Sequence, residues 1–490
     1  MWWWSTATQQ AGESPLSTHP KHCDRRRQRR LQIAAFCFTM VVPSVSQATG
    51  FRIFPQSASG AGQADAFVAQ SDDPSAIYYN PAGVTQLPGI QLMMGALLVG
   101  GGTDFTNRAT GAKSFGNLDG PVSNPPPLHF YLTANLKSVA QALDLPPLAR
   151  MTVGVGVFSP FGLRQRWPED GPLKTSLTFV SLPLLDIRPV IAYKVSEQLS
   201  LAAGADVYTF ASFAGEGGAV TKSRSSGALG PGFPPGTPLE VNGNDTTPGF
   251  NLSLRYTPCL LEGKHPWCSF GFQYRSRATL HLDGEFLKAG MALTTARTTL
   301  VLPQSFTFGA AVWPLMAMDH EWKVEVDLDK TDWSAFHNTD VHLGTGAVIP
   351  VPRNWSNTLT FMVGTEYKWI DPAALAHWDV TARAGWQHSA TPVPSQTFDP
   401  AVPDSDKNIL SVGMGFLCRA GGRFAGLIPC GEQGGWYRPS AIGLDLAYQV
   451  GIYDARDIAD NRPPLTLPTV VNGRYSTLHH AGFVTLRVNF

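Results

Sequence analysis

Histidine and serine come first among the residues that could do chemistry. A hydrolase of the serine type needs a nucleophilic hydroxyl, a nearby His and a group that orients the His. His281 is the His best placed on a predicted strand, facing the interior, and no Ser in a recognisable nucleophile motif lies beside it. His479 and His480 are adjacent, so they face opposite sides of a strand. We therefore assign no catalytic residue and expect no enzyme, with a barrel lipase or deacylase as a less favoured alternative.

Cysteine is the second residue type with possible chemistry. Two close pairs lie beyond the N-terminal region: Cys259 with Cys268, and Cys418 with Cys430. In an oxidising compartment, two such pairs indicate two disulfides. Neither pair has the CxxC spacing common in zinc sites, so we expect no metal and no cofactor.

The compartment follows from the N-terminal region. Five arginines between residues 25 and 30 precede a mostly apolar run over 31–45, and Ser46-Gln47-Ala48 then offers small residues at a cleavage site. This pattern is typical of an export signal, and the run is shorter than the ~20 apolar residues of a membrane-spanning helix. We predict that residues 1–48 are an upstream segment plus a signal peptide cleaved after Ala48.

Composition narrows the class further. The 490 residues carry 37 Lys and Arg against 37 Asp and Glu, and zero net charge argues against nucleic-acid binding. Charged residues make up 15% of the chain, against roughly 25% in an average soluble protein. The 48 glycines and the 11% of aromatic residues favour many strands and turns.

The polar and apolar residues alternate with a period of two. Over 268–283 one face is apolar, from Cys268 to Leu282, and the other carries polar residues such as Gln273, Arg275 and His281. The alternation recurs at 322–329, 380–387, 442–451 and 484–490, and its polar positions hold charges balanced in sign. A soluble β-sandwich also alternates. However, segments near or beyond the ~10 residues of a tilted membrane strand favour a transmembrane barrel. Tryptophans near segment ends, as in an interfacial girdle, favour it too: Trp267, Trp313, Trp333, Trp355, Trp369 and Trp378.

Counting these segments predicts an all-β fold, an antiparallel barrel of about fourteen strands over residues 89–490. The strands are expected near 90–102, 127–137, 150–158, 177–195, 199–213, 248–257, 267–286, 299–315, 321–336, 355–369, 378–392, 408–418, 440–457 and 475–490. Short links such as 196–198 and 317–319 should be periplasmic turns, and long ones such as 214–247 extracellular loops. Residues 49–88 do not read as a strand. Because such a barrel encloses a wide lumen, we expect them to plug it.

An ordered set of motifs resembles the FadL/TodX family of outer-membrane transporters for hydrocarbons and long-chain fatty acids. The resemblance covers essentially the whole chain after residue 48. Its motifs are Gly50-Phe51, the small-residue run 57–62, Asn80-Pro81-Ala82-Gly83, Pro160-Phe161-Gly162-Leu163, residues 189–195, Leu199-Ser200-Leu201, Tyr274-Arg275-Ser276, Leu302-Pro303, Asp332-Trp333-Ser334, Asn354-Trp355, Pro392-Val393-Pro394 and residues 403–406.

The resemblance implies a monomeric barrel with an N-terminal hatch, in which Phe51 and Asn80-Pro81-Ala82-Gly83 are hatch residues. It also implies that a hydrophobic ligand enters an apolar pocket and leaves sideways into the membrane lipid, through a gap made by a kink in the third strand. Ser159-Pro160-Phe161-Gly162 permits that kink, because Pro cannot donate a ladder hydrogen bond and Gly weakens a strand. Composition alone fits a plain strand end equally well, and the resemblance favours the kink.

The candidate pocket residue is Phe210. In the strand 207–210 an aromatic residue stands where fatty-acid members are expected to carry a basic one. This departure favours aromatic or aliphatic hydrocarbons over fatty acids as ligands. A structural or adhesin barrel is the alternative, and a plugged lumen argues against it. We expect the mature protein in the outer membrane of a Gram-negative cell.

Overall fold

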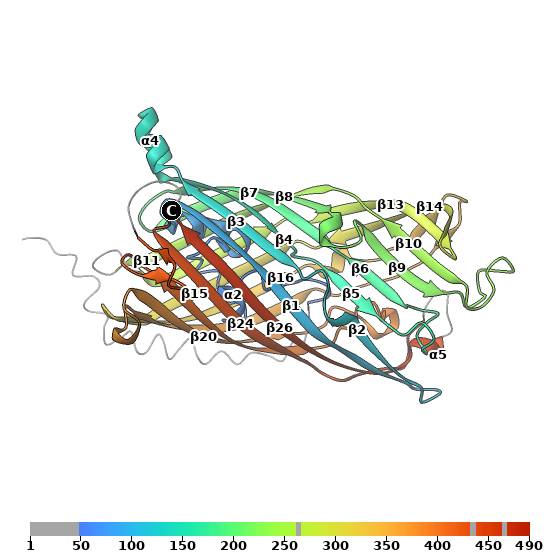
Figure 1. Ribbon diagram of the computed structural model, residues 1–490. Helices are drawn as coiled ribbons and strands as arrows, with labels where there is room; N and C mark the ends of the chain where they lie inside the picture. The colour runs from blue at the N-terminus through green and yellow to red at the C-terminus, as the bar shows by residue number, and fades with distance from the viewer. Residues whose placement is uncertain (1–48, 261–265, 432–437, 463–467) are drawn as a thin grey trace, which may run out of the picture. The chain divides into compact units, whose positions relative to one another are not determined.

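The computed structural model describes residues 49–260, 266–431, 438–462 and 468–490, so the predicted signal peptide lies outside the described residues. The described chain forms a closed antiparallel β-barrel (Figure 1). Within the described residues, no helix is both long and apolar enough to cross a membrane.

Fourteen strands make the ring, and β1 pairs with β26 to close it. In ring order they are β1 (Ile90–Asn107), β3 (Leu128–Asn135), β4 (Met151–Phe158), β7 (Leu184–Lys194), β8 (Leu199–Phe210), β11 (Thr247–Leu260), β12 (Pro266–Arg275), β15 (Ser305–Met316), β16 (His320–Thr331), β19 (Thr358–Ile370), β20 (Trp378–Ser389), β21 (Lys407–Cys418), β24 (Ala441–Tyr453) and β26 (Gly473–Asn489). The predicted fold class and the even number of strands are confirmed.

A second set of strands extends the wall at one end of the ring. They are β2 (Lys113–Val122), β5 (Leu163–Arg166), β6 (Phe179–Leu182), β9 (Ala219–Arg224), β10 (Pro238–Gly243), β13 (Ala278–Lys288), β14 (Met291–Leu302), β17 (Val341–Leu343), β18 (Val348–Ile349) and β25 (Arg456–Ile458). The strands predicted at 177–195, 267–286 and 299–315 are therefore each divided between a ring strand and an extension strand. β22 (Arg423–Phe424) and β23 (Ile428–Pro429) form a separate hairpin.

The helices are short and belong to the segments that precede or connect the ring strands. They are α2 (Ala58–Ala61), α3 (Ala76–Tyr79), η2 (Pro81–Gln86), α4 (Lys137–Leu143), η3 (Pro146–Arg150), η4 (Ser212–Ala214), η6 (Trp333–Ala335), η7 (Ala373–Leu375), η8 (Ser395–Thr397) and α5 (Pro468–Val471). The first three belong to residues 49–88, and α2 lies inside the ring in Figure 1.

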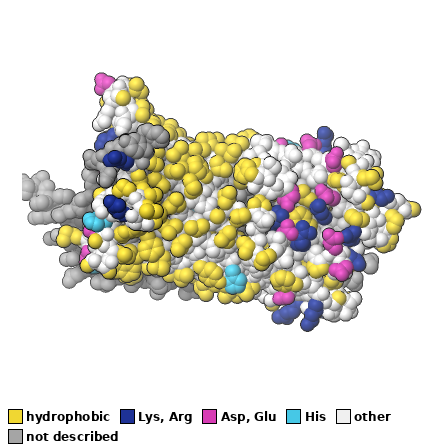
Figure 2. Space-filling model, viewed as in Figure 1, with side chains coloured by type: hydrophobic (Ala, Val, Ile, Leu, Met, Phe, Trp, Pro, Cys, Tyr) yellow, Lys and Arg dark blue, Asp and Glu magenta, His cyan; other side chains and the backbone are white. Residues whose placement is uncertain are grey.

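The ring strands present apolar side chains outward and polar ones inward. On β16, Trp322 and Val326 are exposed while Lys323 and Asp327 are buried. Neighbouring strands repeat this pattern, and a broad belt of hydrophobic side chains covers the ring in the view of Figure 2. Charged side chains gather at the end of the molecule that the extension strands form (Figure 2). This is the distribution expected of a barrel that spans a bilayer.

The alternation over 268–283 changes phase in the middle, which corrects one expectation. β12 ends at Arg275, whose side chain is buried, and β13 begins at Ala278, which is buried as well. Because these two buried residues are three positions apart, an odd number, the alternation shifts by one position between them. Every later side chain on β13 therefore lies on the opposite face from the one predicted. Leu280 and Leu282 point inward, whereas His281 is exposed and does not face the lumen as the sequence predicted.

Three of the predicted girdle tryptophans also lie elsewhere. Trp313 is buried in a cluster with Ala311 and with Ala69 from residues 49–88. Trp333 and Trp355 are buried in the largest hydrophobic cluster, together with Phe51. Trp333 begins the short helix η6, and Trp355 lies in the segment before β19. Trp333 comes after the end of β16 and Trp355 before the start of β19, so both lie where the chain has left strand geometry and can turn inward, which alternation along a strand does not predict.

The cysteines divide into one bonded pair and one pair that is placed by its backbone. Cys418 and Cys430 form a disulfide beside Ile442 and Trp378. Cys259 lies opposite Cys268 in the ladder between β11 and β12. The side chain of Cys259 is outside the described residues, so the Cys259–Cys268 disulfide stays a prediction.

Topology gives the first test. The turn at 196–198 and residues 214–246 lie at opposite ends of β8. Short turns of a bacterial barrel face the periplasm and long loops face outward. A tag inserted near Gly230 should therefore react with an impermeant reagent on intact cells, and a tag at Glu197 should react only after lysis. The reverse labelling pattern would show that the barrel is oriented the other way.

The cysteines give the second test. Non-reducing peptide mapping should find Cys259 linked to Cys268 and Cys418 linked to Cys430. Because the loops that these bonds close are short, each bond should contribute at most ~3 kcal/mol to stability. Replacing Cys418 and Cys430 with Ser should thus leave the heat-modifiable mobility of the folded barrel in place. Free thiols at Cys259 and Cys268, or crossed pairs, would contradict the assignment.

Candidate binding site

Residues 49–88, here called the N-terminal segment, are almost entirely buried among the interior faces of the strands. Small residues allow this dense packing. A Cβ added to Gly60 would lie 2.4 Å from the Tyr79 hydroxyl, and Ser57 caps α2 by accepting a hydrogen bond from the Gly60 N–H. Ile77 and Tyr78 pack against Tyr131 and Phe158 of the wall in one cluster. The segment is thus a folded unit in contact with the wall on several sides.

The predicted Asn80-Pro81-Ala82-Gly83 motif fixes the backbone of this segment. The Asn80 side chain accepts from the Ala82 N–H and donates to the carbonyl oxygens of Val68 and Leu254, at 2.8 and 3.1 Å. Pro81 begins η2, where a missing N–H costs nothing. A Cβ added to Gly83 would lie 2.3 Å from the Ser71 carbonyl oxygen. These contacts favour a structural role for the motif over direct contact with a ligand.

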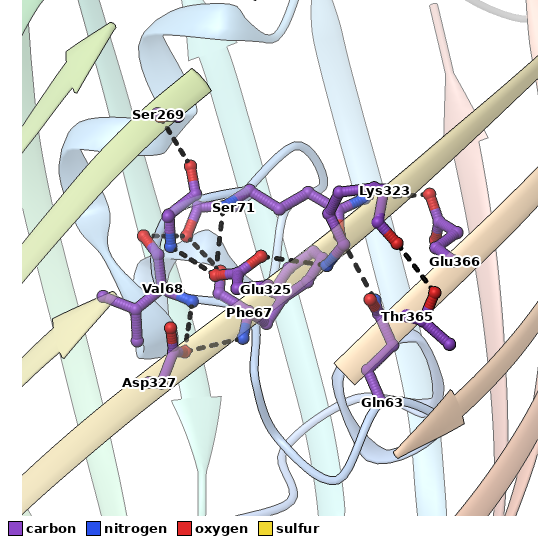
Figure 3. A network of polar contacts seen from close by, with 12 residues as sticks. Gln63, Phe67, Val68, Ser71, Ser269, Lys323, Glu325, Asp327, Thr365 and Glu366 are labelled. Atoms are coloured by element: carbon purple, nitrogen blue, oxygen red, sulfur yellow. Dashed lines mark hydrogen bonds and ion pairs between the residues drawn. The ribbon is translucent and has the colours of Figure 1, made fainter. Parts of the chain in front are cut away.

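Carboxylates on the interior face of β16 hold the segment's free backbone donors (Figure 3). Asp327 accepts from the N–H groups of Phe67 and Val68, each at 2.9 Å. Glu325 accepts from the Ala69 and Gln70 N–H groups at 2.6 and 3.3 Å, and Lys323 lies 2.9 Å from its other oxygen. Buried donors therefore receive charged acceptors, which give the stronger class of hydrogen bond.

A second polar cluster holds the carbonyl oxygen of Tyr78. The Gln273 side chain donates to this oxygen at 2.7 Å, and Arg188 and Arg275 reach it at 3.5 Å. Arg188 is itself paired with Asp186 on β7 and Asp206 on β8, at 2.7 and 2.5 Å. These buried polar groups connect three strands, β7, β8 and β12, to the segment.

The ring wall is interrupted at its third strand. β4 ends at Phe158, and its ladder with β3 ends at the pair Phe130↔Val157. The next pair between the two sides of the wall is Asn117↔Arg166, which joins β2 to β5. Between these two pairs the described strands form no ladder, and Ser159-Pro160-Phe161-Gly162 lies at this interruption.

Residues 51–56 of the N-terminal segment satisfy the backbone groups that the interruption frees. The Ile53 N–H donates to the Pro160 carbonyl at 2.9 Å, and the Gly162 N–H donates to the Phe51 carbonyl at 3.0 Å. The Gln56 amide donates to the Ser159 carbonyl at 2.8 Å. Buried main-chain groups need such partners, so the segment substitutes for the missing neighbouring strand.

A cavity of about 830 Å³ lies at the interruption. Its lining combines residues 51–55, the interrupted strand at 157–165, the proline-rich stretch 125–127 and the interior of β1. Most of the lining is apolar. Three described cations reach it, and each has a carboxylate partner: Arg52 with Asp329 at 2.7 Å, Arg164 with Asp119 at 2.7 Å, and Lys407 with Asp404 at 4.0 Å.

A second cavity of about 340 Å³ adjoins the first on the side of the extension strands. The two cavities share Phe51, Leu163, Ser181, Leu182 and Val402 in their linings. Phe51 is held there by a cage of rings, with centroids 4.8 Å away for Trp333, 5.6 Å for Phe336, 5.7 Å for Trp355 and 5.9 Å for Phe161. Phe51 therefore lies in the partition between the two cavities.

The predicted site residues thus fall into two groups. Phe51 and the stretch 159–162 meet at the larger cavity, whereas Asn80-Pro81-Ala82-Gly83 lies deeper in the segment. Phe210 is half-buried against the aromatic cluster and does not line either cavity. The sequence did not predict roles for Arg52 and Gln56, whose one signal is that they closely follow the Gly50-Phe51 motif.

Loss of Asp327 tests the anchoring of the segment. Asp327→Ala leaves two buried N–H groups without acceptors, at about 1–3 kcal/mol each. Residues 60–75 should then exchange amide hydrogens faster while the barrel stays folded, as hydrogen-exchange mass spectrometry can measure. Asp319→Ala, in an exposed turn, is the matched control. Equal exchange in the two variants would show that the carboxylate does not hold the segment.

Asp65 makes the anchoring depend on pH. Burial raises the pKa of Asp65 to about 7, although hydrogen bonds from Tyr79 and Gln449 oppose this shift. A raised folded-state pKa gives a stabilising contribution that is full below about pH 4 and is lost as pH rises through 7. After correction for intrinsic exchange rates, the segment should open more at pH 8 than at pH 5.5. Asp65→Asn, which suits the left-handed backbone there, should remove the difference. An unchanged difference would refute the role of Asp65.

Comparison with known proteins identifies the family of the chain. Residues 39–420 match the family model for outer membrane protein transport proteins (OMPP1/FadL/TodX). The long-chain fatty acid transport protein of Escherichia coli O6:H1 is 22% identical over 409 residues, covering 76% of this chain and 84% of that protein. A putative outer membrane protein of Neisseria meningitidis serogroup B is 23% identical over 416 residues, covering 75% and 82%.

Solved structures show the same fold. A Pseudomonas aeruginosa FadL homologue aligns with a TM-score of 0.68 at 17% identity, over 90% of this chain and all of that one. The P. putida toluene transporter TodX aligns with a TM-score of 0.55 at 16% identity, over 91% of this chain and 99% of that one. The family match extends over most of the chain, and the fourteen-stranded barrel agrees with it. The chain therefore belongs to the OMPP1/FadL/TodX family of outer-membrane transport proteins.

Proposed function

We propose that this protein carries uncharged hydrophobic molecules passively across the outer membrane and releases them sideways into the bilayer. The observation that carries the proposal is the position of the 830 Å³ cavity at the interruption between β3 and β4. A ligand would enter through the smaller outer cavity, pass Phe51, occupy the larger cavity and leave between the strands.

Physical chemistry supports lateral release. An apolar solute gains about 0.8 kcal/mol for each methylene that leaves water. A route that ends in the periplasm would return the solute to water, whereas a route through the wall delivers it to hydrocarbon. Buried carboxylates and arginines of the wall bind the backbone of the N-terminal segment and hold it in the lumen. The segment would therefore block a straight path through the lumen to the periplasm.

The charges around the cavity favour hydrocarbons over fatty acids. A fatty-acid carboxylate needs a cation that is not already neutralised. Arg52, Arg164 and Lys407, the described cations of the lining, each face a carboxylate of the protein. We therefore favour aromatic or aliphatic hydrocarbons, with long-chain fatty acids as the second candidate. The similar proteins support both classes, since one is named for toluene and another for long-chain fatty acids.

The remaining roles follow from the same arrangement. Residues 49–88 act as the hatch and residues 89–490 as the barrel, which works as a monomer without catalysis. A lipase or deacylase loses its best interior histidine, because His281 is exposed. An adhesin would have no use for an apolar cavity that reaches the wall, so transport is the better account.

Closing the wall tests lateral release. Pro160→Val with Gly162→Thr should favour a continuous strand, because Val and Thr suit ladders and Val restores a backbone donor. Uptake of a radiolabelled hydrocarbon should fall to the level of cells without the protein, while the barrel folds normally. Pro314→Val with Gly232→Thr makes the same exchanges away from the cavity and should leave uptake unchanged.

Crystallography of the closed variant decides the interpretation. Normal uptake by a variant whose third strand is shown to be continuous would eliminate the lateral route. Uptake that is also lost in the control pair would show that the loss comes from the exchanges themselves and not from the wall.

Deleting the hatch distinguishes lateral release from conduction straight through the lumen. Deletion of residues 50–82 removes the anchored segment and exposes the polar interior. The deleted protein should admit small polar solutes, seen as a rise in single-channel conductance in planar bilayers. Conductance equal to that of the intact protein would show that the segment does not close the lumen.

A further inference from the structure

The connection between β3 and β4 is longer than most of the turns at its end of the barrel. It holds α4 and η3, whereas the next turn at this end, between β7 and β8, spans only 195–198. α4 projects sideways from the rim, at the same end of the ring as the C-terminus (Figure 1). By the rule that short turns face the periplasm, this rim is the periplasmic one.

The projecting connection is apolar although it is exposed. Val139, Leu143 and Leu145 are 44%, 60% and 49% exposed, and Ala140 is the only buried residue of α4. Between residues 137 and 150 the charges are limited to Lys137, Asp144 and Arg150. Hydrophobic side chains are visible along the protrusion in Figure 2. In water this surface would be costly, since exposed apolar area is disfavoured by about 25 cal/mol per Å².

The apolar surface continues the lipid-facing belt of the barrel. Leu132 on β3 and Ile191 and Tyr193 on β7 are exposed apolar residues on the strands beside it. Arg150 donates to the Val195 carbonyl at 3.3 Å, which fastens the end of the connection to the end of β7. The Leu136 N–H donates to the Met151 carbonyl at 3.0 Å and fastens its beginning. These two hydrogen bonds thus hold the connection at the periplasmic edge of the lipid-facing belt.

We propose that residues 136–150 lie in the inner leaflet of the outer membrane, at the boundary between phospholipid headgroups and acyl chains. Helices of this kind bury their apolar side chains about 5–10 Å into that boundary. Val139 and Leu143, four residues apart, share one face and enter the acyl region, while Gln141 lies on the opposite face toward water. Lys137 and Arg150 remain at headgroup level, where long basic side chains find phosphate. This contact between residues 136–150 and membrane lipid does not depend on which ligand the protein transports.

Depth measurement by spin labelling tests this inference. Cysteine replaces Leu143 or Gln141 in the full mature chain, which is labelled with a nitroxide and reconstituted in vesicles of phosphatidylethanolamine and phosphatidylglycerol. Both positions are exposed, so the barrel should fold in either variant. The unsubstituted chain, labelled in parallel, gives the background from its own cysteines, and Val139→Cys serves as a second site on the apolar face.

The expected result is opposite accessibility at the two faces. Labels at Leu143 and Val139 should collide with oxygen and be shielded from a water-soluble nickel chelate, and the label at Gln141 should show the reverse. Equal accessibility at Leu143 and Gln141, in either sense, overturns the inference. Strong nickel contact at both sites would place the helix in the periplasm, where its apolar face would be open to a soluble protein.

Discussion

A strand that breaks within a membrane barrel leaves main-chain donors and acceptors that lipid cannot satisfy. In this protein the break lies at Ser159–Gly162, and residues 51–56 of the N-terminal segment supply the partners. The ladder can be interrupted at this point because the interior segment takes the hydrogen bonds of the missing neighbour. The cavity, its apolar lining and its position beside the lipid belt all depend on this exchange.

The segment can serve in this way only if it is itself held in place. Its backbone carries donors that have no partner within the segment, and Asp327 and Glu325 accept them. Arg52 bonds to Asp329 on the same strand at 2.7 Å. β16 therefore places three acidic residues in succession toward the lumen, each engaged by the segment. The Arg52–Asp329 pair also neutralises one of the three described cations that line the cavity, and Asp119 and Asp404 neutralise the other two, Arg164 and Lys407.

Strand periodicity predicted the architecture well because lipid and lumen impose opposite polarity on alternate positions. The run Lys323-Glu325-Asp327-Asp329 was recognisable as interior from this rule alone. The prediction at Ser159–Gly162 rested instead on its Pro and Gly residues and on the family resemblance. Where the rule failed, the chain left regular geometry. The two residues after Arg275 shifted the phase and turned His281 outward, and Trp333 and Trp355 turned inward in segments outside the strands.

The pocket itself was less predictable, for a physical reason. Its lining comes from segments hundreds of residues apart, and local pattern carries no information about which of them meet. Phe210 was proposed for the pocket from the resemblance to fatty-acid members, and its side chain packs against the largest hydrophobic cluster and lines neither of the two cavities. Phe51 was placed in the hatch by resemblance, while its position in the partition between two cavities depends on the ring cage of Trp333, Trp355 and Phe336.

The most direct test of the account is to map where a photoactivatable aromatic hydrocarbon reacts during uptake by intact cells. If ligand leaves through the interrupted wall, mass spectrometry should find adducts at Phe130, Val157 and Leu163 and on membrane phospholipid. Adducts at Thr257 and Thr381, buried residues near the periplasmic ends of their strands, without adducts at the interruption, would contradict it. Such a result would mean that the ligand passes straight through the barrel, past the N-terminal segment.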